Sequence, residues 1–417
     1  MKFVFGWLRN QVVLALGTLL VILLSVLQFN LAPTQAQPQT SMQLDAPPLE
    51  ITEGWQYYWG DFPLNEAGVP VWTQEKISSL GWHPFQFPKR LWKQPRQAIV
   101  WLRVPLPSGQ WQSPALYLRA VPYILGAYID NKPIYKELSL NSLNQVERED
   151  YQWPVIPLEP NFAGKTLFFR VYAGYASAAD IYIGLFDRVM VGSQTSLIKH
   201  LIKKEIGSIL GTSFALLGLM ALLISLNRQE KQAYIKFGIL SILVGTYTTA
   251  NSQIITLFFS NTVALDYIQN LSFYLIPISG CIFFEEVFGA RYRSIIRYLW
   301  QINLVYALIA ITLVTTNLAL WSQTIFPAQL LFLVNALVLL FTAIKILIRG
   351  NQDAKLFTFG FIILTLSAVH DILVYILSPA TWHSRIYPWG TLVFILISGF
   401  ILESRFNQAR KRLQAYA

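Results

Sequence analysis

The stretch IGSILGTSFALLGLMALLISL, residues 206–226, decides the fold class. It contains no charged side chain, and a helix needs about 20 residues to cross a hydrocarbon core of about 30 Å. The stretch therefore predicts a membrane-spanning helix. The composition agrees, because 54% of the 417 residues are hydrophobic and 13% are charged, whereas roughly a quarter of an ordinary soluble domain is charged.

Seven further apolar runs of similar length divide the chain into parts. One lies near the N-terminus, a polar stretch follows it, and the other six come after residue 226 at short intervals. This order predicts a membrane protein with α and β parts: a signal peptide or N-terminal anchor (1–36), a polar domain (37–196), a seven-transmembrane-helix bundle (197–403) and a cytoplasmic tail (404–417). The further runs are Val12–Leu31, Ala233–Ile255, Ile268–Phe288, Leu299–Leu318, Ile325–Leu347, Leu356–Leu377 and Pro388–Glu403.

The N-terminal run carries signals for two different fates. Lys2 and Arg9 precede it, and the small residues Thr34 and Ala36 follow it at the positions that a signal peptidase reads. The run itself is long for the apolar core of a signal peptide, which favours an uncleaved anchor. Both alternatives place the polar domain outside the cytoplasm.

Basic residues alternate between the turns of the bundle. The positive-inside rule assigns the loops rich in Lys and Arg to the cytoplasm. The turns opposite to the basic ones hold only Arg385, so the rule predicts a cytoplasmic C-terminus and explains the net charge of +10 without a nucleic-acid partner. The stretch 198–204, which holds three lysines just before the bundle, is read as an amphipathic juxtamembrane segment. The basic turns and tail hold Arg228, Lys231, Lys236, Arg291, Arg293, Arg297, Lys345, Arg349, Lys355, Arg405, Arg410, Lys411 and Arg412.

The polar domain has the short alternating runs of a β protein. Runs of this length, separated by turn residues and rich in β-branched and aromatic side chains, predict strands, and their number predicts an antiparallel β-sandwich. One face is apolar, for example Val100, Leu102 and Val104, and is expected to form the core; Asp130-Asn131-Lys132 is expected to form a hairpin turn. The predicted strands are Ala98–Leu106, Ala115–Val121, Gly126–Tyr135, Lys165–Tyr172 and Asp180–Val191.

The opposite face of three of these strands combines aromatic rings with arginines. Such a face suits a ligand platform, because rings stack on sugars or bases and guanidinium groups bind carboxylates or phosphates. The alternative is a solvent face whose arginines lie across the rings. Eight of the 13 tryptophans fall in this domain, which suits carbohydrate recognition or, alternatively, the filling of a small core. The candidate ligand-binding residues are Trp59, Trp82, Trp101, Arg103, Tyr117, Arg119, Arg170 and Tyr172.

The stretches 55–60 (WQYYWG), 81–84 (GWHP), Ala98–Pro105 and 127–131 (AYIDN) carry a resemblance. They look like the extracellular jelly-roll module, similar to galactose-binding-like domains, of bacterial seven-transmembrane receptors with diverse intracellular signalling modules. The order of parts resembles that family along essentially the whole chain. The resemblance implies a signalling receptor that senses an extracytoplasmic ligand, for such a module a carbohydrate, and passes a conformational change to a cytoplasmic output module. The chain departs from the family in its hairpin turn and in ending where an output domain usually follows.

The tail after Glu403 has the spacing of a helix. Four apolar residues recur at heptad-like intervals beside a basic cluster, which predicts the beginning of a signalling helix that pairs two copies as a homodimer and contacts a cytoplasmic signalling domain or protein. The alternative is a basic tail that binds anionic lipid. The four apolar residues are Phe406, Ala409, Leu413 and Tyr416.

The candidate functional residues inside the predicted spans are the polar residues Asn251, Asn335, His370 and Asp371. Polar groups are costly in a membrane, so each is a functional candidate. They could line a pocket for a small ligand or a proton, or they could fix the packing through interhelical hydrogen bonds.

Enzyme chemistry has no motif in this chain. The four histidines form no cluster and Cys281 is the only cysteine, so we expect no enzyme activity, no cofactor and no metal site. The rival function is a membrane transporter, or an accessory subunit, with a carbohydrate-binding periplasmic domain. Transporters usually carry paired Gly or Pro interruptions, and only Pro277 interrupts a predicted span in this way.

Overall fold

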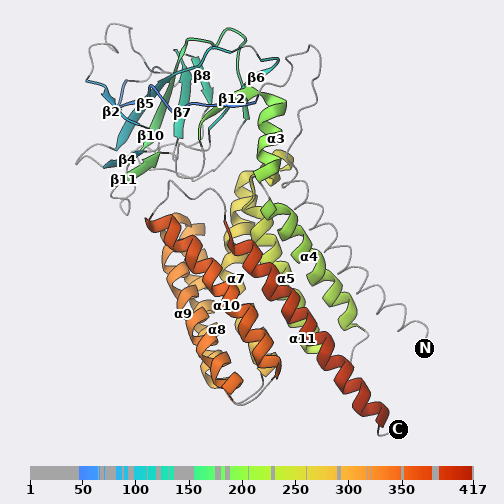
Figure 1. The fold of residues 1–417 in the computed structure, drawn as a ribbon. Coiled ribbons are helices and arrows are strands. Elements are labelled where there is room, and N and C mark those ends of the chain that lie inside the picture. The colour runs from blue at the N-terminus through green and yellow to red at the C-terminus, as the bar shows by residue number, and fades with distance from the viewer. Residues whose placement is uncertain are drawn as a thin grey trace, which may run out of the picture. The chain divides into compact units, whose positions relative to one another are not determined.

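The fold is given by a computed structural model (Figure 1). The predicted N-terminal segment, 1–36, lies outside the described residues. The structure describes residues 47–63, 65, 70, 81–86, 89–92, 98–109, 111–118, 124–130, 132–135, 155–173, 180–183, 188–204, 206–226, 231–259, 261–288, 293–316, 318–319, 321–348, 352–377 and 385–415.

In the described part of the polar domain, twelve strands form antiparallel sheets. The larger sheets have the orders β3-β2-β5-β10-β7-β8 and β1-β12-β6-β9, and β11 pairs with β4. The antiparallel β region that the sequence predicts is confirmed. The strands are β1 (Leu49–Glu50), β2 (Gln56–Trp59), β3 (His83–Pro84), β4 (Lys89–Trp92), β5 (Ile99–Pro105), β6 (Pro114–Tyr117), β7 (Ile124–Ile129), β8 (Lys132–Tyr135), β9 (Val155–Pro157), β10 (Thr166–Tyr172), β11 (Asp180–Ile183) and β12 (Met190–Ser193).

Two predicted strands are each divided in two. The run 126–135 becomes β7 and β8, joined at Asp130, whose φ of 51° is the left-handed conformation that the predicted turn requires. The run 180–191 becomes β11 and β12, which lie in different sheets. Gly184 and the charged pair Asp187-Arg188 interrupt the apolar alternation there, so one continuous strand was a wrong prediction.

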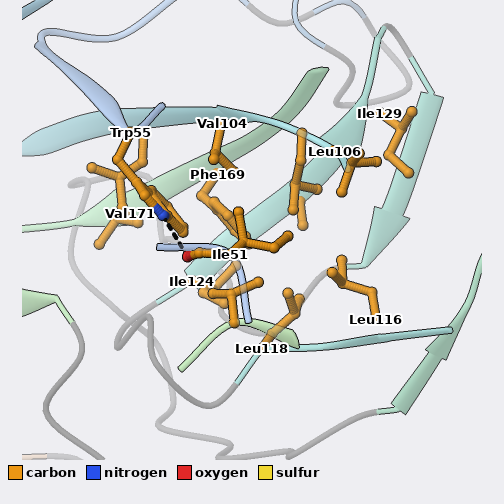
Figure 2. Close-up of a cluster of buried hydrophobic side chains, with 14 of the residues drawn as sticks. Ile51, Trp55, Val104, Leu106, Leu116, Leu118, Ile124, Ile129, Phe169 and Val171 are labelled. Atoms are coloured by element: carbon orange, nitrogen blue, oxygen red, sulfur yellow. Dashed lines mark hydrogen bonds between the residues drawn. The ribbon is translucent and has the colours of Figure 1, made fainter. Parts of the chain in front are cut away.

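The core of the β region lies between the two larger sheets, as Figure 2 shows. The face predicted from alternation is confirmed: Val100, Leu102 and Val104 of β5 are fully buried there. Trp55 is 1% exposed, and its indole Nε1 donates to the Ile51 carbonyl at 2.8 Å, so the ring enters the core without leaving a buried donor unpaired.

The helical region begins with a short helix and continues with long apolar ones. Six of the described helices are long and apolar enough to cross a membrane: α4, α7, α8, α9, α10 and α11. The chain is therefore a multi-pass membrane protein. The helices are α3 (Gln194–Lys204), α4 (Ile206–Ser225), α5 (Lys231–Ala250), α6 (Gln253–Phe258), α7 (Thr262–Phe288), α8 (Arg293–Thr315), α9 (Trp321–Ile348), α10 (Gln352–Leu377) and α11 (Tyr387–Ala415).

The expected count of seven spans is not confirmed. The remaining predicted span corresponds to α5, in which Lys231 and Lys236 lie in the first two turns and a threonine-rich stretch lies in the last. These polar residues make α5 less apolar, and it is not among the six candidate spans. The expectation that only Pro277 interrupts a span was also wrong. Because α9 begins at Trp321, before the expected Ile325, Pro327 lies beyond its first turn and inside the helix, as Pro277 does in α7.

Helices α4 and α5 approach each other closely through glycines. A Cβ atom built on Gly245 would lie 2.4 Å from the backbone nitrogen of Ala215, and one on Gly218 would lie 2.6 Å from the carbonyl oxygen of Gly238. Ser241 of α5 donates to the carbonyl oxygen of Phe214 in α4 at 2.8 Å. Small residues that let backbones touch are a common way to pack helices where the hydrophobic effect is weak.

The close approach predicts opposite effects for the same substitution at two glycines. Gly245→Ala should force α4 and α5 apart and lower the melting temperature of the purified protein in detergent. Gly280→Ala in α7 meets nothing within 4 Å, so the better helix propensity of alanine, about 1 kcal/mol, should leave the melting temperature unchanged or raise it. Equal effects at both positions would contradict the packing.

Candidate functional site

The outer face of the six-stranded sheet carries a second buried cluster. Trp101, Phe168, Tyr128 and Tyr172 form it with Ile99 and Leu125, while Phe62 and Trp82 pack over it. The Phe62 and Trp101 rings meet edge to face, with centroids 5.2 Å apart. Trp101 is fully buried, so this face is covered by the domain's own aromatic side chains.

The Asp61 carboxylate binds the guanidinium group of Arg170 on this face. Its carboxylate accepts from Arg170 Nε at 2.9 Å and from Arg170 Nη2 at 2.5 Å, and Oδ1 also accepts from Trp101 Nε1 at 3.1 Å. Such two-point contacts are the strong form of the arginine–carboxylate pair. Arg170 is thus already bound to a carboxylate of its own domain, which an acidic ligand would have to displace.

The second arginine on this face lies across an aromatic ring. Arg103 Nε donates to Gln56 Oε1 at 2.6 Å, and its guanidinium carbon lies 4.3 Å from the centre of the Trp82 ring. Desolvation lowers the pKa of Arg103. Desolvation also raises the pKa of Tyr128, a shift that Arg170 opposes and Asp61 increases. These contacts favour the alternative reading, in which arginines lie across rings.

The eight predicted ligand residues do not share one face. Trp59 lies in the core between the sheets. Tyr117 belongs to β6 of the other sheet and is buried under α3, so its placement beside Trp101 was wrong; alternation fixes the face of a strand but not its sheet. Arg119 lies outside the described residues. The residues brought together are Trp82, Trp101, Arg103, Arg170 and Tyr172, and their binding of a ligand stays a prediction.

Asp61 was not predicted, and its removal should be costly. Asp61→Asn cannot receive both guanidinium donors of Arg170, whose side chain is 13% exposed, so we expect a loss of about 1 to 3 kcal/mol of stability. The melting temperature of the purified protein measures it. The matched control is Glu159→Gln, which removes the exposed Lys132 pair and should change little. A control effect as large as that of Asp61→Asn would show that surface charge in general, rather than this pair, is responsible.

The junction between the β region and the helices contains no loop. Strand β12 ends at Ser193, whose Oγ accepts the backbone N–H of Ser196 at 3.1 Å as the cap of α3. Leu197 and Leu201 of α3 pack against Tyr117 and Met190. The amphipathic segment expected at 198–204 is therefore a helix, but a sheet covers its apolar face. Only residue 205 separates α3 from α4.

The predicted intramembrane polar residues fall into two separate sets. Asn335 of α9 donates to Asn303 Oδ1 of α8 at 2.9 Å, and Asn303 donates to the Leu299 carbonyl at 2.7 Å. Asn303 was not predicted as a partner, because a single asparagine gives no sign of which helix it faces. This set connects two helices, as the structural alternative predicts.

The second set surrounds the start of α11. Both carboxylate oxygens of Asp371 in α10 accept backbone N–H groups, from Ile386 at 3.1 Å and from Tyr387 at 3.0 Å. His370 Nδ1 lies 3.1 Å from Asp371 Oδ1. Asn251, just after α5, lies beside the Tyr387 hydroxyl. Three of the four predicted residues thus gather at one helix start.

A small cavity lies between α7, α8 and α9. Its lining includes Phe273, Pro277, Asn303, Tyr306 and Phe332, and its volume is about 10 Å³. That is room for roughly one water molecule, far below the volume of a small-molecule site. Among the described residues, no group of three or more His, Cys, Asp or Glu side chains could hold a metal ion.

Helix α11 is continuous from Tyr387 to Ala415 and is 29 residues long, which corresponds to about 43 Å. Near its far end, the Tyr234 hydroxyl of α5 donates to Glu403 Oε2 at 3.2 Å. Lys236 of the same helix pairs with Glu286 of α7. The predicted helix after Glu403 is confirmed as an extension of the last span.

The four predicted seam positions lie at the end of this helix. Phe406 is half-buried, and Ala409 and Leu413 lie within α11, although their side chains are outside the described residues, as is the whole of Tyr416. Their pairing with a second copy stays a prediction.

Comparison with known families adds one finding. Residues 206–405, from α4 through most of α11, match the family model described as 7TM diverse intracellular signalling. No curated protein matches the chain. The match confirms the resemblance for the helical region, and it suggests a transmembrane signalling receptor.

Proposed function

We propose that this chain is a receptor of a bacterial inner membrane: its periplasmic sandwich, a jelly roll, senses an extracytoplasmic ligand, and α11 passes the resulting change to a cytoplasmic output module. The carrying observation is the continuity of α11, which extends as one helix from the Asp371 contact to the basic tail. A continuous helix moves as a unit, so a displacement at its start reaches its end.

The connection from the β region to the helices is also short. Strand β12 leads into α3 without a loop, Leu197 and Leu201 hold α3 on the sheet, and α4 follows after one residue. A ligand-induced shift of the sheet would therefore act on α4. The glycine contacts make α4 and α5 a closely packed pair, and α5 contacts α11 through Tyr234.

The orientation follows from charge. The turns that carry most of the Lys and Arg residues lie at the same ends of the helices as the basic tail, which the positive-inside rule assigns to the cytoplasm. The β region precedes α4 at the other end of that helix, which corresponds to the periplasm. The lipid bilayer is thus one partner, and the output protein or domain is the second.

The ligand that we propose is a carbohydrate, because the domain is a sandwich with many aromatic side chains. The Asp61–Arg170 pair makes an acidic sugar a poor fit for the covered face, so a neutral oligosaccharide is the better candidate. Such a ligand binds through ring stacking and neutral hydrogen bonds.

Neutral oligosaccharides should stabilise the purified full-length protein. A ligand at 100 times its dissociation constant adds about 2.7 kcal/mol of stability, which a melting curve in detergent detects. Acidic oligosaccharides of equal size serve as the comparison. No shift with any sugar would contradict carbohydrate sensing, and accumulation of a labelled sugar in proteoliposomes would instead favour a transporter.

The tail should pair with a second copy along one stripe. Partner helices in a coiled coil lie about 8 to 10 Å apart, so single cysteines at Phe406, Ala409 and Leu413 in a Cys281→Ala background should cross-link in membranes. Cysteines at Asn407 and Gln408, which fall outside the heptad-like spacing, are the controls. Equal cross-linking at seam and control positions would indicate a lipid-bound tail instead.

A further inference from the structure

We infer that Asp371 is a positioning residue whose carboxylate sets the resting position of α11. The contact of this carboxylate with the backbone N–H groups of Ile386 and Tyr387 is called the latch. The inference rests on the proposed role of α11 as the output helix. It names the contact that a signal must break or move.

The latch uses both oxygens of a buried carboxylate. Asp371 is 6% exposed, and its two oxygens take one N–H group each, at 3.1 and 3.0 Å. The first N–H groups of a helix have no carbonyl partner within the helix, and a negative charge beside them is favourable. Helix caps usually come from the residue just before the helix. Here the cap comes from another helix, so α11 cannot leave α10 without exposing unpaired polar groups on both.

A close backbone approach keeps the latch within reach. A Cβ atom on Gly390, in the first turn of α11, would lie 2.0 Å from the Ser367 Oγ of α10, and one on Gly360 of α10 would lie 2.9 Å from Ile397. The two helices therefore touch along several turns below the latch. These contacts block a tilt of α11 toward α10. Sliding along α10 and separation from α10 are the movements that they allow sterically.

The same helix start also faces α5. The Tyr387 and Tyr247 rings lie 6.2 Å apart, and the Tyr387 hydroxyl lies beside the side chains of Thr248, Asn251 and Arg385. Tyr387 is therefore held through its backbone by α10 and through its side chain by α5. A shift of α5, the partner of α4, would pull on the residue whose N–H group Asp371 holds.

His370 is the neighbour that separates a latch from a general polar cluster. Its Nδ1 contacts the same carboxylate, but its side chain is 49% exposed, and the two backbone N–H groups of the latch donate to Asp371. Removing His370 should therefore leave the two N–H bonds in place. This difference provides a control one residue away from the tested position.

Hydrogen exchange of the full-length protein in detergent tests the latch without ligand or output partner. In the wild-type protein, the Ile386 and Tyr387 amides, read from overlapping peptic peptides, should be protected. In Asp371→Asn, whose amide nitrogen cannot accept, exchange at the amide that loses its acceptor should be at least tenfold faster, and in His370→Gln both amides should stay within twofold of wild type. Unprotected wild-type amides, an unchanged Asp371→Asn, or equal effects of both substitutions would overturn the inference.

A distance measurement tests the consequence for α11. Nitroxide labels at Phe359 of α10 and Phe400 of α11, which are 60% and 63% exposed, in a Cys281→Ala background should give one narrow distance distribution. Adding Asp371→Asn should shift or broaden it, and adding His370→Gln should not. Unchanged distances in a folded Asp371→Asn protein would overturn the latch while leaving the receptor proposal, which depends on ligand binding and tail pairing, untouched. If Asp371→Asn fails to fold, the wild-type amide protection still decides the contact.

Discussion

The hydrocarbon core of a membrane contains no water, so polar groups on the helices must find partners inside the protein. The rest of the bundle depends on this constraint. Asn335 pairs with Asn303, and Asp371 takes the free N–H groups at the start of α11. Each pair joins two different helices. The polar residues that are most costly in lipid therefore fix which helices are neighbours.

In the β region, the outer faces of the two larger sheets are covered by other parts of the protein. The six-stranded sheet places Trp101 and Arg170 outward, and Asp61, Phe62 and Trp82 cover them. The four-stranded sheet is covered by α3 through Leu197 and Leu201. One outer face is thus closed by a loop of the domain and the other by the helix that leads to the membrane. A displacement of either sheet would therefore act directly on the segment that covers it.

Periodicity predicted much of this fold and little of its polar contacts. Apolar length gave six spans and alternation gave the core face of β5, because both depend on residues close in sequence. Tyr117 was misplaced because alternation cannot assign a strand to a sheet, and α5 was too polar at its ends to be confirmed as a span. Asp61 and Asn303 carry no local signal; their partners lie 109 and 32 residues away. Asp371 was found as a candidate from its position alone, but its role as a cap required coordinates.

The continuity of α11 has a consequence for whatever follows it. A helix advances by about 100° per residue, with 3.6 residues per turn, so a module fused to Ala415 takes a rotational phase fixed by the latch region. One inserted residue would turn that module by more than a quarter circle, whereas seven would nearly restore it. The spacing between the last span and an output module is therefore a matter of angle as much as of length, and only some linker lengths would present the same face of the module to a neighbour.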